Sequence, residues 1–238
     1  MKHLVISHGD KGGVGKSIFS MLAVEFGLFS GRNVAIVEGD TKIGDVKARY
    51  ENVVSVLSVN LDKSGKDAEN AMATLFSHLE ALQSDLVVMN LPANSHKAID
   101  AYAEIITPVA QELGLQICVA WMIGRESSSA TMANESTICQ LADRKMAVVN
   151  RHESDYDQDY YWFTTPQYKD AWIASGGLTG EIPELASRVG GKVKEYQGRS
   201  FASLAGPESP LFVIERQIIK NWLRKSWQES VIPLIEGE

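Results

Sequence analysis

A glycine-rich loop between an apolar strand and an amphipathic helix is the feature that most constrains the fold of this chain. Residues 3–8 (HLVISH) form a short apolar run, which indicates a buried strand. Residues 16–31 (KSIFSMLAVEFGLFSG) place apolar side chains at helical spacing and end at a glycine. The backbone N–H groups of the connecting residues 9–15 (GDKGGVG), together with the helix N-terminus, suit an anion. The first 31 residues therefore predict a phosphate-binding loop.

The end of this loop carries the residue types that bind a nucleoside triphosphate and its metal ion. Lys16 is expected to reach the β and γ phosphates, and the Ser17 hydroxyl is expected to bind Mg²⁺. The strict pattern G-x-x-x-x-G-K-[ST] fails by one residue, because Asp10 stands where the first glycine belongs. The predicted nucleotide-binding residues of the loop are Gly12, Gly13, Val14, Gly15, Lys16, Ser17 and Ile18.

The stretch KGGVGKS at residues 11–17 resembles the deviant Walker A motif, KGGxGK[ST], of the ParA/MinD family of P-loop ATPases. The resemblance extends loosely over about the first 185 residues. It implies that ATP and Mg²⁺ bind between two subunits and that Lys11 reaches across the dimer to the partner's phosphates. A cation supplied in this way would neutralise charge that develops on the transferred phosphoryl group. The family varies at the position of Asp10, which we expect to pair with a basic residue across the interface.

Two further segments match family motifs, with departures. In VEGDTKIGD, Asp40 matches the carboxylate that orients the attacking water, and Glu38 replaces an aspartate. In DLVVMNLPAN, Asn90 stands where the family has a metal-holding aspartate, with Pro92 in register. An amide brings no charge, so we hypothesise that Glu38 compensates for Asn90 at the magnesium site. The resemblance thus implies a catalytic set of Lys11, Lys16 and Asp40 and a metal set of Ser17, Glu38 and Asn90.

Recognition of the base is assigned to two later segments. The resemblance implies that Asn150 and Arg151, in VVNRH, and Pro183 and Glu184, in EIPEL, surround the adenine. From the residues alone, all four fit ordinary loops equally well, and the pattern does not distinguish adenine from another base.

Apolar strand patterns alternate with helical patterns through the first 150 residues, which favours an α/β fold. We expect a doubly wound, mostly parallel sheet with helices on both faces, in a single domain over residues 1–238. A C-terminal helical segment is predicted at about residues 207–230, with Leu211, Ile214, Ile218 and Trp222 on one apolar stripe. The acidic and aromatic stretch 151–168 is expected to begin as a long loop, and its aromatic residues 160–163 are expected to form a packed lid or partner contact or else plain core. Its DYDQDY segment lacks the glycine and glutamate of a calcium loop.

Charge and composition limit the partners. The net charge of −7 argues against a protein coated with basic residues for nucleic acid, but residues 188–225 hold eight basic residues and three acids, a net of +5. Packing on the sheet is the first interpretation of the C-terminal helix in this stretch, and the family resemblance adds weak contact of its basic face with nonspecific DNA. The resemblance also implies a DNA-binding adaptor protein as a partner of the chain. The acidic C-terminus counts against a membrane. Two cysteines and the absence of a long apolar run favour a cytoplasmic location, with nucleoid association through DNA.

The function expected from the sequence is a nucleotide-dependent dimerising switch. The short chain resembles the small ParA-like proteins encoded on plasmids for partition, stability or conjugal transfer. One alternative is a nonhydrolysing nucleotide-binding scaffold, favoured by Asn90 and Glu38. Another is a metabolic ATP-dependent ligase on the same fold, against which Lys11 argues, because such enzymes need no lysine from a partner.

Overall fold

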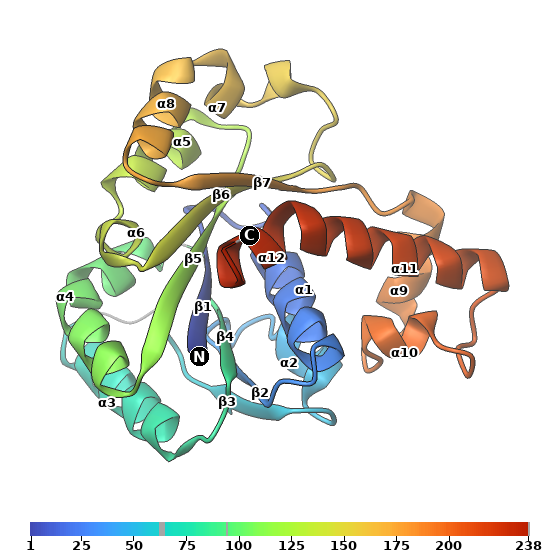
Figure 1. Cartoon of the computed structure of the whole chain (residues 1–238), viewed down its shortest axis with the longest axis horizontal. Helices are drawn as coiled ribbons and strands as arrows, with labels where there is room; N and C mark the ends of the chain where they lie inside the picture. Colours follow the sequence, from blue (N-terminus) through green and yellow to red (C-terminus); the bar gives the residue numbers. More distant parts are fainter. Residues whose placement is uncertain (62–64, 94, 238) are drawn as a thin grey trace.

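A parallel sheet of seven strands lies at the centre of the computed structural model, which describes residues 1–61, 65–93 and 95–237 (Figure 1). The strand order is β3-β2-β4-β1-β5-β6-β7, and every neighbouring pair is parallel. The strands are β1 (Lys2–His8), β2 (Val34–Glu38), β3 (Ser55–Ser58), β4 (Leu86–Asn90), β5 (Leu115–Ile123), β6 (Arg144–Asn150) and β7 (Leu178–Ile182). The predicted α/β class with a parallel sheet is therefore confirmed.

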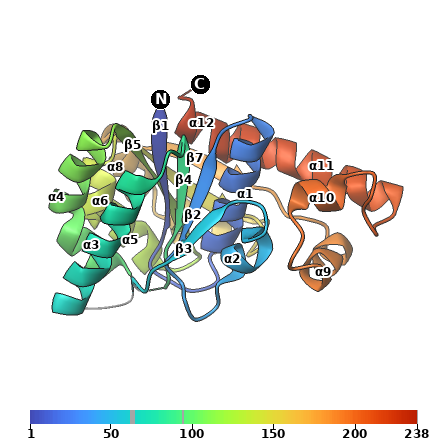
Figure 2. The same ribbon diagram turned by 90° about the horizontal axis from the view of Figure 1, so that it is seen from below.

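Helices cover both faces of the sheet, as Figures 1 and 2 show. One face packs against α1 (Lys16–Phe29), α2 (Asp45–Tyr50), α9 (Ser187–Glu195), α10 (Phe201–Ala205), α11 (Val213–Ser226), the π-helical turn η2 (Trp227–Val231) and α12 (Ile232–Ile235). The other face packs against α3 (Lys66–Ala81), α4 (His96–Glu112), α5 (Ser127–Glu135), α6 (Thr137–Leu141), α7 (Tyr161–Thr164) and α8 (Pro166–Ala174). A 3₁₀ turn, η1 (Asp157–Asp159), precedes α7. Two apolar cores result, one on each side of strands that are buried on both faces.

The order of the strands positions the functional site. From β1 the chain crosses to β2 on one side, whereas β5 lies on the other side of β1, so the order reverses beside β1. In open α/β sheets ligands bind at this reversal, beyond the carboxyl ends of the strands. The register brings Ser7, Glu38 and Asn90 to this end, because Asn90 is paired with Ser7 on one side and with Glu38 on the other.

Several local expectations need correction. The segments that form α2 and β3 are too short to give a clear periodic pattern, and the sequence did not indicate them. The predicted C-terminal segment contains α11 at Val213–Ser226, and Ile214 is 66% exposed rather than part of the buried stripe. The aromatic residues Tyr160 and Trp162 are fully buried, so of the two alternatives for the aromatic run they are core residues and not a lid or partner contact. The Tyr160 phenol ring and the Trp162 indole ring belong to the apolar core on the side of the sheet that α7 and α8 cover.

Candidate functional site

The loop between β1 and α1 has the backbone shape that an anion requires. Gly13 and Gly15 have φ angles of +83° and +111°, which side chains other than glycine rarely adopt. A Cβ at Gly15 would stand 2.7 Å from the Asn150 side-chain nitrogen, so the loop also lies against the end of β6. Gly15 immediately precedes the first turn of α1, whose N–H groups have no partners within the helix. The loop thus offers backbone donors at a helix N-terminus, as predicted.

Lys16 is buried and turned back into the loop. Its ammonium donates a hydrogen bond to the backbone carbonyl of Lys11, on the far side of the loop. Burial lowers the pKa of Lys16 to about 8, while the charges of Asp10 and Asp40 oppose this shift. A buried ammonium held over a glycine-rich loop suits the charge and position of a bound phosphate.

Lys11 behaves differently, because its side chain points out of the loop. It forms an ion pair with Glu126, in the segment between β5 and α5, and the Lys11 side chain is 41% exposed. The neighbouring Asp10 is buried and accepts a hydrogen bond of 2.7 Å from Ser128 Oγ. Asp10 therefore lies inside its own chain, and the expectation that it pairs across an interface is wrong.

A hydrogen-bonded chain of side chains lies beside the start of α1. Asn90 donates to Glu38 Oε1 at 2.8 Å and approaches Ser17 Oγ at 3.5 Å through the same amide nitrogen. The amide oxygen of Asn90 accepts from Ser20 Oγ at 3.3 Å. Burial raises the pKa of Glu38, and its hydrogen bond from Asn90 partly offsets this effect. The three predicted metal residues, Ser17, Glu38 and Asn90, are therefore brought together.

The loop after β2 joins this chain of contacts through backbone groups. The backbone N–H of Asp40 donates to Glu38 Oε1 at 3.2 Å, and that of Lys47 donates to Glu38 Oε2 at 3.1 Å. Asp40 Oδ1 in turn accepts from the N–H groups of Lys42 and Ile43, both at 3.2 Å, which holds the loop in a tight turn. The turn thus uses one oxygen of the half-buried Asp40 carboxylate.

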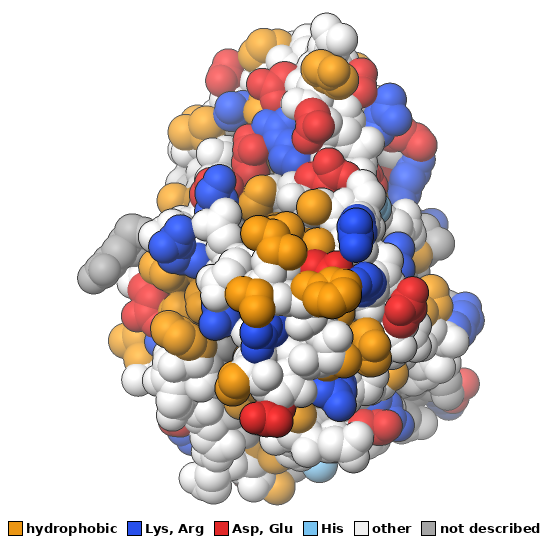
Figure 3. Space-filling view, turned by 90° about the vertical axis from the view of Figure 1, so that its right-hand side faces the viewer, with side chains coloured by type: hydrophobic (Ala, Val, Ile, Leu, Met, Phe, Trp, Pro, Cys, Tyr) orange, Lys and Arg blue, Asp and Glu red, His pale blue; other side chains and the backbone are white. Residues whose placement is uncertain are grey.

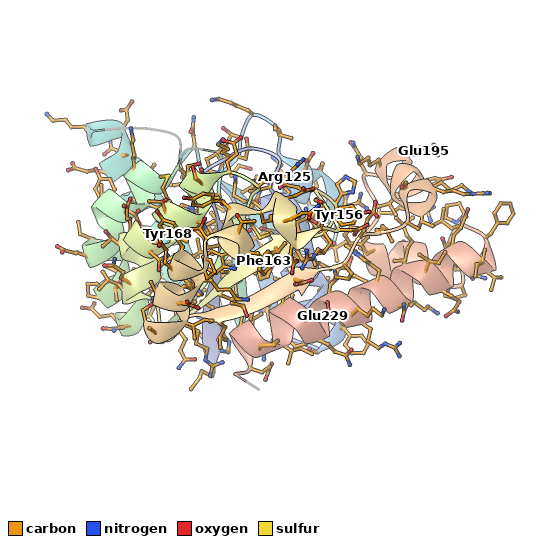
Figure 4. The ribbon with its side chains drawn as sticks, turned by 90° about the horizontal axis from the view of Figure 1, so that it is seen from above. Arg125, Tyr156, Phe163, Tyr168, Glu195 and Glu229 are labelled. Carbon is orange, nitrogen blue, oxygen red and sulfur yellow. The ribbon has the colours of Figure 1, made fainter. Side chains whose placement is uncertain are left out.

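A hollow of about 330 Å³ opens beside the loop on the side of β5. It is lined by Lys11, Gly12, Val14, Gly124, Arg125, Glu126, Ser129 and Glu153. Figure 4 looks onto the end of the sheet where the strands finish, and it labels Arg125 after β5 and Tyr156 after β6. The hollow therefore lies between the phosphate loop and two loops that follow neighbouring strands.

The residues predicted to surround the base lie at the ends of β6 and β7. Asn150 is paired in register with Ile182, directly before Pro183. Arg151 forms two hydrogen bonds with Glu181, of 2.7 and 2.5 Å, and an ion pair with Asp157 at 2.9 Å. The Pro183 carbonyl accepts from Trp222 Nε1 at 2.8 Å. Glu184 lies 3.8 Å from the imidazole of His152.

Comparison with known proteins supports the fold of the chain. No protein-family model matches the chain. It is 25% identical over 210 residues to protein MobD of Acidithiobacillus ferrooxidans, which covers 88% of this chain and 89% of that protein. Among solved structures it is similar to the septum site-determining protein MinD of Pyrococcus horikoshii in complex with Mg-ADP, with a TM-score of 0.54, 17% identity and coverage of 94% and 95% of the two chains. The chain has the P-loop fold of MinD.

A second MinD, the cell division ATPase of Pyrococcus furiosus, aligns with a TM-score of 0.50 at 18% identity, over 94% of this chain and 98% of that one. The structure of the Pyrococcus horikoshii protein was solved in complex with Mg-ADP. In this chain the loop glycines, Lys16 and the Ser17 hydroxyl fit a phosphate with its metal ion. The described residues contain no group of three His, Cys, Asp or Glu residues that could hold a metal alone.

Sequence reasoning missed three contributors to the site: Glu126, Ser128 and Ser20. The first two follow β5, whose carboxyl end meets that of β1 at the same edge of the sheet. A prediction of strand order would have identified them as neighbours of the loop. Ser20 lies one turn after Lys16 on α1, and the helical period alone could have indicated it.

Proposed function

We propose that this chain is a nucleotide-dependent switch that binds ATP and Mg²⁺ between two copies of itself and hydrolyses ATP slowly. Binding would favour a dimer able to engage its partners, and hydrolysis would release that dimer. The two lysines of the loop carry this proposal. Lys16 is buried within the loop, whereas the side chain of Lys11 is 41% exposed and directed away from it. The exposure of Lys11, beside a loop whose centre is already occupied by Lys16, supports a role for Lys11 outside its own loop.

Each group of residues then has a defined task. The backbone of Gly12, Gly13, Val14, Gly15 and Ile18 and the side chains of Lys16 and Ser17 hold the phosphates. When bound, Mg²⁺ supplies positive charge to the phosphate oxygens, and Ser17, Glu38 and Asn90 would hold it directly or through water. Asp40 orients the attacking water, and Lys11 serves the partner's nucleotide. The base lies against Asn150, Arg151, Pro183 and Glu184.

The cellular role that we propose is in plasmid partition, stability or conjugal transfer. The similarity to protein MobD, at 25% identity over most of both chains, supports a role in plasmid mobilisation. The partners would be nonspecific DNA and a DNA-binding adaptor protein, in the cytoplasm and on the nucleoid. Within the described residues no helix is long and apolar enough to cross a bilayer.

Sedimentation of the chain with and without Mg-ATP tests the switch. We expect the wild-type protein to pass from monomer to dimer when Mg-ATP is added. Lys16→Ala should lose both nucleotide binding and dimerisation, whereas Lys11→Ala should bind a fluorescent ATP analogue normally and stay monomeric. A dimer that forms without nucleotide and persists in Lys11→Ala would contradict the proposal.

A nonhydrolysing scaffold is the second candidate, and Asn90 is the observation that favours it. The neutral side-chain amide of Asn90 donates a hydrogen bond to the Glu38 carboxylate at 2.8 Å. Glu38 therefore supplies the only charge of this pair. Release of phosphate, measured with and without DNA, separates the two candidates. Dimerisation with Mg-ATP but no release of phosphate under either condition would favour the scaffold.

A further inference from the structure

Three consecutive apolar side chains are exposed where α11 begins. Phe212, Val213 and Ile214 are 67%, 63% and 66% exposed. Single exposed apolar residues are common on protein surfaces, whereas a contiguous group is a candidate interaction site. The group is not the core-facing side of α11, because that side is formed by other residues, Ile219, Trp222 and Leu223, which are buried.

The exposed group is held in a fixed arrangement by a buried acid. Glu215 is 3% exposed; its carboxylate accepts from the Phe212 N–H at 3.0 Å and forms an ion pair of 2.7 Å with Lys192 on α9. Arg188, also on α9, approaches the same carboxylate at 3.6 Å. The Lys192 ammonium lies 4.8 Å from the centre of the Phe212 ring. Because these contacts already order the surface, the protein side of a complex would lose little conformational entropy on binding.

Positive charge surrounds this group. We define the C-terminal tip as Phe212, Val213, Ile214, Arg188 and Lys192. Figure 3 faces the end of the molecule that carries α9, α10 and the start of α11, and shows apolar side chains with lysine and arginine side chains around them. Residues 188–225 carry a net charge of +5, and since the whole chain carries −7, the remainder carries −12. At the tip itself, Arg188 and Lys192 carry two positive charges against the single carboxylate of Glu215, and this excess favours an acidic ligand.

We propose that the C-terminal tip is a docking surface for an acidic, amphipathic segment of a protein partner. An apolar centre with a charged rim is the arrangement found at protein–protein interfaces. Nucleic-acid phosphates need the cations but not three exposed apolar side chains. A helix that lies on a membrane needs an apolar face along its length, and the apolar face of α11 is buried against the chain.

The tip is linked to the nucleotide site through α2. The backbone N–H of Lys47, in the first turn of α2, donates to the Glu38 carboxylate at 3.1 Å. Arg49, two residues later, donates to the Val193 carbonyl at 3.1 Å, near the end of α9. One short helix therefore contacts both the acid of the site and the element that carries the tip cations. On the proposed function, this surface is where the switch meets its partner.

Binding of two fluorescent peptides to the nucleotide-free protein tests the docking surface. Both would have about 20 residues and the same content of leucine and glutamate, but only one would place leucine along a single helix face. By fluorescence anisotropy at physiological salt, we expect that amphipathic peptide to bind about tenfold more tightly than its scrambled partner. Equal or absent binding of the two peptides would overturn the proposal.

Paired variants test the apolar centre. The double change Phe212→Ser with Ile214→Ser should weaken binding of the amphipathic peptide about tenfold. Its control is Val53→Ser with Ile105→Ser, which alters two other exposed apolar residues and should leave binding unchanged. Circular dichroism and binding of a fluorescent ATP analogue should be unchanged in both double variants. Equal loss of peptide binding in the control would overturn the assignment of the site.

A second pair tests the charged rim. Arg188→Ser should weaken binding of the amphipathic peptide about threefold. Arg224→Ser removes an exposed cation from the other end of α11 and should have no effect. An equal effect of both changes would indicate attraction by net charge alone and would overturn the proposal.

Two further ligands complete the experiment. Duplex DNA and vesicles of anionic lipid are tested in the same way as the peptide. If either binds more tightly than the amphipathic peptide, and the double change at Phe212 and Ile214 abolishes that binding, the choice of a protein partner is overturned. Because the peptide is tested without nucleotide, peptide binding by a chain that failed to bind ATP would support the tip and remove only the proposed switch.

Discussion

Asn90 donates its side-chain N–H to Glu38 Oε1 over 2.8 Å, at positions that are paired in register between β4 and β2. The same amide joins Ser17 and Ser20 of α1, so one neutral side chain connects two strands with the helix that follows the phosphate loop. A carboxylate at position 90 would face the buried carboxylate of Glu38 with no donor between them. The single acid of this pair and the neutral amide therefore form a matched arrangement.

Asn90→Asp tests this pairing. Two carboxylates in contact repel each other unless a proton or a cation lies between them, and the lost hydrogen bond to a charged group contributes roughly 1–3 kcal/mol. We expect the variant to be less stable than wild type by that amount in the absence of metal and to regain stability with Mg²⁺. Urea unfolding with EDTA or with Mg²⁺ measures both. Ser20→Ala, which removes a partner of Asn90 without adding charge, should show no such rescue.

Glu38→Gln tests whether Glu38 supplies the charge that Asn90 lacks. The variant should need more Mg²⁺ than wild type for half-maximal binding of a fluorescent ATP analogue, because an amide binds Mg²⁺ more weakly than a carboxylate. Burial raises the pKa of Glu38, so the wild-type Mg²⁺ requirement should also increase as the pH falls and the acid becomes protonated. An unaltered magnesium requirement in Glu38→Gln would remove this residue from the metal site.

Nucleotide binding should depend on pH through Lys16. Burial lowers the pKa of Lys16 to about 8, so the ligand-free chain loses the charge on this lysine as the pH rises through that value. We expect the affinity for ATP to decrease between about pH 7 and pH 9, because only the ammonium attracts phosphate. Lys16→Arg keeps its charge over this range, so its affinity should be lower but independent of pH. A flat profile for the wild-type chain would contradict this assignment.

Glu126→Gln should favour the proposed dimer. The ion pair with Glu126 holds Lys11 within its own chain, and Lys11 must leave it to reach a partner's nucleotide. We expect half-maximal dimerisation in Mg-ATP at a protein concentration about threefold lower than for wild type, a change of less than 1 kcal/mol, as suits an exposed ion pair. Glu153→Gln, also in the lining of the hollow, should behave as wild type in the same sedimentation experiment. Identical dimerisation of all three proteins would exclude the ion pair as a restraint.

A buried acid outside the site gives a prediction on stability. Glu25 of α1 accepts from Tyr50 at 2.8 Å and from the Ala202 N–H at 3.1 Å, and burial raises its pKa. A raised pKa means that the contribution of Glu25 is complete below its unfolded pKa of 4.5 and decreases as the pH rises through the folded value. The stability advantage of wild type over Glu25→Gln should therefore be larger near pH 5 than near pH 8. Urea unfolding at both pH values measures this stability advantage. A larger advantage near pH 8 would contradict burial as the cause of the raised pKa of Glu25.

The amino-acid sequence by itself determined the strand–loop–helix unit and the class of the fold. Each apolar strand or helix pattern can be recognised within a short stretch of sequence, and the roles of Lys16 and Ser17 follow from their spacing within the loop. The resemblance of two short later segments to family motifs also indicated Glu38 and Asn90 as members of one site. These features depend on neighbours along the chain, which is why they could be predicted.

Only the tertiary structure decided which distant residues complete the site and which surfaces remain exposed. Glu126 meets Lys11, and Ser128 meets Asp10, because β5 lies beside β1 in the sheet, and no local pattern records that order. Ile214 had the spacing of a core residue, yet it is exposed because α11 extends beyond the sheet at its first turn. Side-chain burial and contact across the sheet depend on packing between segments far apart in the chain, so they are fixed only when the fold is complete.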